Sequence, residues 1–166
     1  MPITNLDLAK VFAREIAAVK AEVLGYPDDE TLWREVPGLP NSSGTLALHL
    51  AGSLRHFLGA GIGGSGYKRD RPVEFATRGT SRAEVAAILD AAAIEVSAAF
   101  AKAPANLLEV MPPIPFPGDK QLSAPLAILH LSSHLAYHLG QMDYHRRSVT
   151  GDKTGVGAMD FLPLTT

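Results

Sequence analysis

The sequence predicts an all-α fold, an antiparallel four-helix bundle that forms a single domain over residues 1–166. Three observations predict it. Apolar residues recur every three or four positions in four long segments, capping residues stand at the starts of these segments, and most of the Gly and Pro residues lie between them. The composition, 46% hydrophobic and 19% charged, is that of a globular protein, and 166 residues suit one compact core.

The helix boundaries follow from capping and breaking residues. Ser81 and Glu84 have capping-box spacing, and Pro125 lies in the first turn of the last helix, where its missing N–H costs nothing. The predicted helices are residues 6–24 behind Thr4 or Asn5, a single turn at 30–34, a helix from Ser42 or Ser43 to about residue 58, one from 82 to about 103, and one from Ser123 to about Arg147. The proline-rich segment 103–123 is long enough to carry a short hairpin or a functional loop, and residues 156–166 are expected to pack back on the bundle.

Composition also excludes several classes of function. The formal net charge of -2 gives no basic excess, so nucleic acid is not an expected partner. The chain has no cysteine, and therefore any metal site must use His, Asp or Glu. No run approaches the roughly 18 apolar residues of a membrane span, and the N-terminal segment resembles an amphipathic helix more than a signal peptide. We therefore expect a cytoplasmic protein without membrane contact.

Four of the six histidines fall within residues 128–147. His130, His134 and His138 are four positions apart, so on a helix they lie on nearly the same face, and two imidazoles at this spacing can hold one transition-metal ion. Spacing alone does not choose between the pairs His130/His134 and His134/His138. A third ligand must come from another helix, and His49, in an apolar stripe of the second long helix, is the candidate. Three neutral imidazoles with an open position are typical of a catalytic metal site.

A competing interpretation needs no metal. A single histidine on an apolar helix face, as at His49, is more often a core residue that hydrogen-bonds a carbonyl group. His56, His130 and His145 remain further candidate ligands.

The segment "HLAYHLGQM", residues 134–142, resembles the H-x-x-x-H-x-G-Q element on the last long helix of the DinB-like (YfiT-like) superfamily of metal-dependent enzymes. "NSSGTLALHLAGSLRHF" and "GYKRDRPVEF", residues 41–57 and 66–75, resemble the second-helix histidine segment and the R-x-R-x-x-E-F stretch of one branch of it. The resemblance implies a four-helix bundle, frequent homodimers, and a divalent ion, often nickel or zinc, held by His49, His134 and His138. Members of the superfamily resemble transferases of low-molecular-weight thiols or a maleylpyruvate isomerase, and many have no known activity.

Other residues near these histidines are candidates for supporting roles. Tyr137 and Gln141 could orient a ligand, and core packing for Tyr137 and solvent exposure for Gln141 are alternatives of equal weight. Arg69 and Arg71 could hold a carboxylate or a thiol-cofactor anion beside the metal, or could form surface ion pairs. "GIGGSG" at residues 61–66 matches a dinucleotide-binding pattern but follows a helix instead of a strand, so a helix exit explains it better.

The sequence therefore predicts a protein with one divalent transition metal that acts on a small molecule as a hydrolase or as a transferase of a low-molecular-weight thiol. The resemblance favours zinc or nickel, while three imidazoles also suit iron, manganese or cobalt. Two alternatives stay open. One is a non-catalytic dimeric bundle, a stress-related or binding protein with a vestigial site, and the other is a metal-binding module without turnover.

Overall fold

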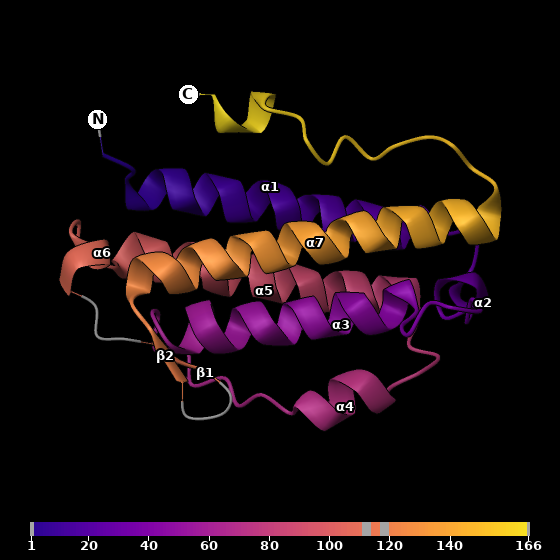
Figure 1. Cartoon of the computed structure of the whole chain (residues 1–166), viewed down its shortest axis with the longest axis horizontal. Coiled ribbons are helices and arrows are strands. Elements are labelled where there is room, and N and C mark those ends of the chain that lie inside the picture. Colours follow the sequence, from indigo (N-terminus) through magenta and orange to yellow (C-terminus); the bar gives the residue numbers. More distant parts are fainter. Residues whose placement is uncertain (1, 111–113, 117–119, 166) are drawn as a thin grey trace.

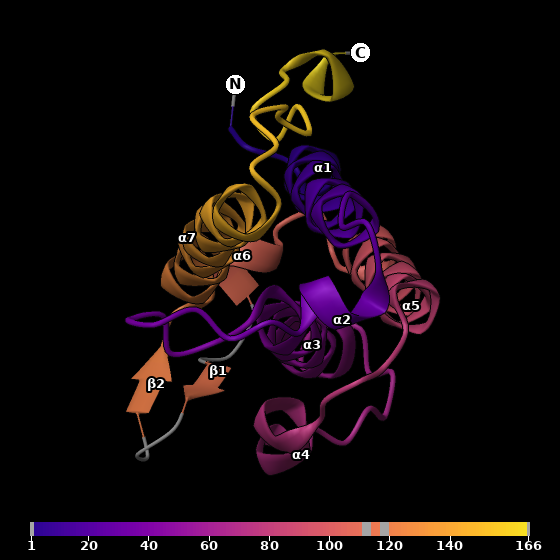
Figure 2. The same cartoon turned by 90° about the vertical axis from the view of Figure 1, so that its right-hand side faces the viewer.

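Four long helices lie side by side in the computed structural model, which describes residues 2–110, 114–116 and 120–165 (Figure 1). They are α1 (Asn5–Leu24), α3 (Ser43–Leu54), α5 (Arg82–Lys102) and α7 (Ala124–Thr150), and α3 continues as one π-helical segment, η1 (Arg55–Ala60). Seen along their axes, α1 and α3 each pack against both α5 and α7 (Figure 2). The prediction of an all-α fold is confirmed.

The long helices do not simply alternate in direction. α1 and α7 run one way along the bundle, and α3 and α5 run the other (Figure 1). At one end the Asn5 side chain donates to the carbonyl of Pro104, just beyond α5, at 2.9 Å. At the other end Arg82, the first residue of α5, pairs with Asp29 beside the end of α1 at 3.0 Å. Since α3 and α5 are parallel, the chain between them crosses the length of the bundle and carries α4 (Arg71–Ala76).

Most helix starts match the predicted caps. The Thr4 side chain accepts the Asp7 N–H in a capping box, Ser42 caps α3, and Ser81 caps α5 in a second capping box. α7 extends three residues beyond the expected end and stops at Gly151, whose φ of 73° lies in the left-handed region. The capping pattern was therefore a reliable guide to where these helices begin.

The sequence did not predict α4. Asp70 caps it by accepting the Val73 N–H at 3.2 Å, and Pro72 lies in its first turn, where proline is favoured. The remaining short elements are α2 (Asp29–Leu32), α6 (Leu107–Val110), β1 (Ile114–Phe116), β2 (Lys120–Leu122) and the 3₁₀ turn η2 (Leu162–Leu164). β1 and β2 pair antiparallel, which confirms the hairpin before the last helix, and η2 packs on α1 as expected of the C-terminal segment.

The apolar faces of the four long helices form one core between them. Trp33 is buried over Gly44 of α3, and its Nε1 donates to the Thr80 carbonyl at 2.7 Å. A Cβ at position 44 would lie 2.7 Å from three ring atoms of Trp33, so only glycine fits there. Within the described ranges no helix combines the length and apolarity needed to cross a membrane.

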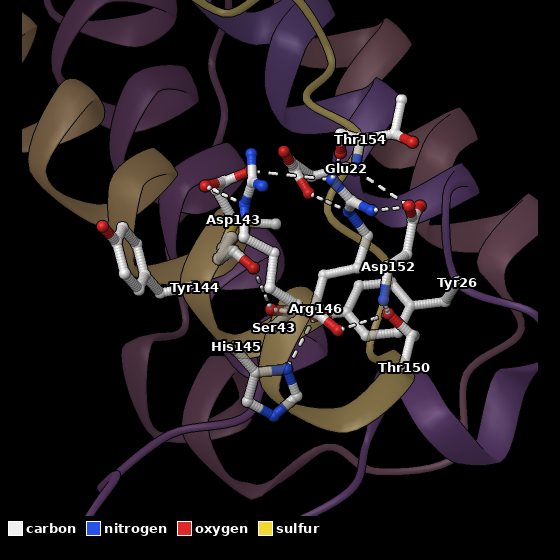
Figure 3. Close-up of polar contacts among 12 residues, drawn as sticks. Glu22, Tyr26, Ser43, Asp143, Tyr144, His145, Arg146, Thr150, Asp152 and Thr154 are labelled. Atoms are coloured by element: carbon white, nitrogen blue, oxygen red, sulfur yellow. Dashed lines mark hydrogen bonds and ion pairs between the residues drawn. The ribbon is translucent and has the colours of Figure 1, made fainter.

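One ion-pair cluster ties three parts of the chain together near the end of α7 (Figure 3). Arg146 is only 2% exposed, and its Nε donates to Glu22 of α1, which is fully buried, at 2.5 Å. The same guanidinium pairs with Asp152 at 3.0 Å and donates to the Thr154 carbonyl at 2.6 Å. These contacts fasten α1 and the C-terminal segment to the last turn of α7.

Replacing Arg146 by Ala should destabilise the fold strongly, because it leaves the Glu22 carboxylate buried without its partner. Loss of one member of a buried pair costs about 3–5 kcal/mol, measured as the change in the free energy of unfolding in urea. Arg147→Ala is the matched control, since Arg147 is a third exposed and pairs with Asp143 at the surface. Equal effects of the two substitutions would show that the buried cluster contributes nothing special.

Candidate metal centre

Three histidines from two helices meet in the space between α3 and α7. His49 projects from the middle of α3, and His134 and His138 project from successive turns of α7, which packs on α3. The His134 Nε2 atom lies 3.2 Å from His49 Nε2 and 3.1 Å from His138 Nε2. The ligand atoms of the three residues are all within 4.8 Å of one another, so together they could hold a metal ion.

The hydrogen bonds around the outer two rings fix which nitrogen faces the centre. His49 Nδ1 lies 3.1 Å from Glu74 Oε2, and His138 Nδ1 lies 2.6 Å from Gln141 Oε1. A carboxylate and an amide oxygen only accept hydrogen bonds, so each Nδ1 carries the hydrogen and each Nε2 presents a lone pair. His134 Nε2 therefore faces two lone pairs, and its single hydrogen can satisfy only one of them.

Glu74 is itself held by Arg69. Arg69 Nε donates to Glu74 Oε1 at 2.7 Å, and its Nη2 donates to Oε2 at 2.8 Å, a bidentate pair. Arg69 Nη2 also lies 3.1 Å from His49 Nδ1, and both nitrogens can donate to the same carboxylate oxygen. Burial acts to raise the pKa of Glu74, but the hydrogen bonds from Arg69 and His49 outweigh it and lower that pKa, so the carboxyl group is ionised.

A missing side chain makes room for this carboxylate. Glu74, on α4, packs against Gly52 of α3, one turn from His49. A Cβ at position 52 would lie 2.7 Å from the Glu74 carboxyl carbon and closer still to Oε1. Only a glycine at position 52 allows α4 to bring Glu74 into contact with His49.

Burial keeps the central imidazoles neutral. Burial is the main cause that lowers the pKa of His134 to about 4, and the positive charge that His138, His49, His130 and Arg69 would place nearby contributes the rest. Burial also lowers the pKa of His138, against the hydrogen bond to Gln141. Neutral imidazole is the form that binds a metal ion, so near neutral pH these rings need not lose a proton first.

The structure decides between the two histidine pairs that have the same spacing in the sequence. The pair that meets His49 is His134/His138, while His130 is exposed, with its ring 6.1 Å from that of His134 and 5.5 Å from that of Phe116. His56 lies in η1, outside the three-histidine group, and burial lowers its pKa.

His145 belongs to a separate buried chain of hydrogen bonds. Its Nε2 donates to the Arg34 carbonyl at 2.8 Å, and its Nδ1 lies 2.7 Å from the Tyr26 hydroxyl (Figure 3 labels Tyr26 and His145). That hydroxyl is also 2.6 Å from Ser43 Oγ. His145 thus joins α7 to the end of α1 and the start of α3 and takes no part in the candidate metal centre.

The supporting residues named from the sequence take different places. Gln141 contacts His138 directly, and Tyr137 is 65% exposed with its ring edge-on to that of His138 at 5.2 Å. Arg69 is bound to Glu74, and the exposed Arg71 stacks over Phe75 at 4.7 Å, so their role in substrate binding stays a prediction.

Sequence reasoning missed Glu74. Its signal was present, because Asp70 followed two residues later by Pro72 is a helix start, and a helix there places Glu74 in the first turn.

The fold and the site together define a helical bundle with a three-histidine group that could hold a metal ion. A sequence model of the DinB superfamily matches residues 12–142, which include all three histidines, Arg69, Glu74 and Gln141. The chain belongs to the DinB superfamily. Neither a curated protein nor a solved structure matches it.

Gly52→Ala should weaken metal binding about 10–100-fold, the usual loss when a ligand's hydrogen-bonding partner is removed, because the new methyl group displaces Glu74 from His49. The dissociation constant for Zn²⁺ or Co²⁺, measured by calorimetry, tests this. Gly44→Ala is the matched control on the same helix, since its Cβ would collide with Trp33 and not with Glu74. It should lower stability and leave metal affinity unchanged; equal losses of affinity in both variants would contradict a role for Glu74.

Proposed function

We propose that the protein binds one divalent transition-metal ion, zinc or nickel, through His49, His134 and His138, and uses it to activate a small nucleophile. The observation that carries the proposal is the convergence of three Nε2 atoms. In His49 and His138 the hydrogen bond at Nδ1 leaves a lone pair on Nε2, and both lone pairs point to the centre. Without a cation one lone pair stays unsatisfied, whereas a metal ion accepts all three.

The donor set favours a catalytic over a structural centre. Three protein ligands leave a fourth position of a tetrahedral ion free, while closed structural sites normally use four. All three ligands are neutral, and the negative charge of Glu74 is balanced by Arg69. The protein therefore leaves the charge of the ion uncompensated, which favours an anionic fourth ligand.

When bound, such an ion supplies a Lewis acid that lowers the pKa of a coordinated water or thiol. The chain's own residues hold the ligands in place, with Glu74 fixing the ring of His49 and Gln141 fixing that of His138. This supports a metal-dependent hydrolase, or a transferase that moves a low-molecular-weight thiol onto an electrophilic small molecule. We place the protein in the cytoplasm, where such thiols are kept reduced, and homodimer formation remains a prediction.

Metal content gives the first test. Protein purified without a histidine tag should contain close to one metal ion per chain by elemental analysis, and the double substitution His134→Ala with His138→Ala should abolish binding. The bundle should stay folded by circular dichroism, because its apolar core is untouched. His130→Ala, on the same helix one turn earlier, should bind metal normally. Metal uptake that survives the double substitution would exclude these ligands.

Activity gives the second test. If the centre is catalytic, the metal-loaded protein should accelerate either ester hydrolysis or the addition of a small thiol to an electrophile, and a chelator should remove the activity until metal is restored. The same double substitution controls for background reaction. A fully loaded protein that is inactive in a broad panel of both reactions would favour a binding module without turnover.

A further inference from the structure

A groove runs along α7 from Tyr137, the neighbour of His138, toward the end of the helix. It has a volume of about 460 Å³ and is lined by residues 39–41, by Leu46 of α3, and by the α7 positions from Tyr137 to Ser148 that face them. We call it the α7 groove. Its volume is in the range of about 300–1,000 Å³ that is usual for small-molecule sites, and the segment between α2 and α3 forms its outer wall.

The groove adjoins the candidate metal centre through two residues that contact His138. Gln141 lines the groove, and its Oε1 is the hydrogen-bond partner of His138. Tyr137 also lines it, and the Tyr137 ring lies against that of His138. With a rise of about 1.5 Å per residue, the groove begins beside His138 and extends roughly 12 Å from position 140 to position 148. A ligand anchored at the metal could therefore extend one group into it.

Gly140 on the groove is unexplained by packing within the chain. Glycine inside a helix costs about 1 kcal/mol relative to alanine, and each of the other helical glycines meets a neighbour that fills its place: Gly44 meets Trp33, Gly52 meets Glu74 and Gly59 meets Glu95. A Cβ at position 140 would have no atom of another part of the described chain within 4 Å. The absent side chain adds depth to the groove beside the candidate metal ligands.

The lining indicates the chemistry of the occupant. Among the described residues that line the groove none is Asp, Glu, Lys or Arg, and most of its surface is apolar. Tyr137 and Tyr144 expose 65% and 74% of their surfaces, and in Figure 3 the Tyr144 ring points away from the Arg146 cluster. Both ring nitrogens of His145 are already hydrogen-bonded, and burial lowers its pKa, so it adds no charge near neutral pH. Flat aromatic surfaces without charged neighbours favour an uncharged aromatic group.

We infer that the α7 groove binds an uncharged aromatic group of the substrate while the reacting group of the same molecule lies at the metal. The inference rests on the proposed metal centre and adds the substrate class to it. The aromatic ring packs over Gly140 between Tyr137 and Tyr144, and residues 39–41 cover its other side.

Thiols that differ only beyond the sulfur provide the test. The Co²⁺-loaded protein is titrated with benzyl mercaptan, 2-mercaptoethanol and 3-mercaptopropionate, and the thiolate-to-cobalt absorption band gives a dissociation constant for each. Benzyl mercaptan should bind at least about tenfold more tightly than either aliphatic thiol, since burial of roughly 60 Å² of ring surface is sufficient for that gain.

Gly140→Phe should fill the groove and remove this preference, and should leave Co²⁺ affinity and the binding of 2-mercaptoethanol unchanged. Leu129→Phe is the matched control, because it enlarges an exposed α7 side chain about 16 Å along the axis from Gly140. It should keep the preference for benzyl mercaptan.

The other outcomes are distinguishable. Equal affinity of the unaltered protein for all three thiols would overturn the aromatic groove and leave the metal centre standing. A protein that takes up no Co²⁺, or takes it up without a thiolate band, would overturn the metal centre or its open position instead. Dimerisation of the unaltered protein that Gly140→Phe abolishes in analytical ultracentrifugation would show that a second copy covers the groove, which also overturns the inference.

Discussion

The candidate site depends on one constraint, the placing of three imidazole Nε2 atoms around one point, to which those of His49 and His138 present lone pairs. His49 and His138 are prevented from relieving it, because their other nitrogens are engaged by Glu74 and Gln141. Rotating the His49 ring would leave the buried Glu74 carboxylate facing a C–H group in place of an N–H group, which costs about 1–3 kcal/mol. The packing of α3 on α7 brings the rings together, and the hydrogen bonds behind them keep their orientation.

The connection between α3 and α5 supplies the residues that hold the ring of His49 in this orientation. The two helices are parallel, so the connection has to return along the bundle, and it does so along α3, against which α4 packs (Figure 2). α4 lies on this return and supplies Glu74, while the residues before it supply Arg69. A direct antiparallel connection would be too short to deliver either side chain. The parallel pair in the bundle therefore serves the candidate metal centre as well as the core.

What the sequence could predict was local. Caps such as Thr4, Ser42 and Ser81 bond to atoms within three residues, and His134 and His138 are related by a single helical turn, so both follow from spacing alone. His49 could be proposed because a histidine in an apolar stripe is unusual and because the family resemblance places a ligand there. The buried pair of Arg146 with Glu22, 124 residues apart, and the approach of Glu74 to Gly52 had no such signature, since they depend on which helices become neighbours. Tertiary neighbours decide these contacts, and periodicity does not specify neighbours.

The glycines within helices differ in what occupies the space beside them. A glycine within a helix gives up about 1 kcal/mol relative to alanine, and this loss is accounted for where a neighbouring side chain occupies the space. Trp33 occupies it at Gly44, where the gain is core packing, and Glu74 occupies it at Gly52, where the gain is the orientation of His49. At Gly140 the described chain offers no occupant, although His138 is only two residues away. Because two of these glycines are filled by groups that the fold or the site requires, an open one beside the candidate metal ligands points to an occupant from outside the chain.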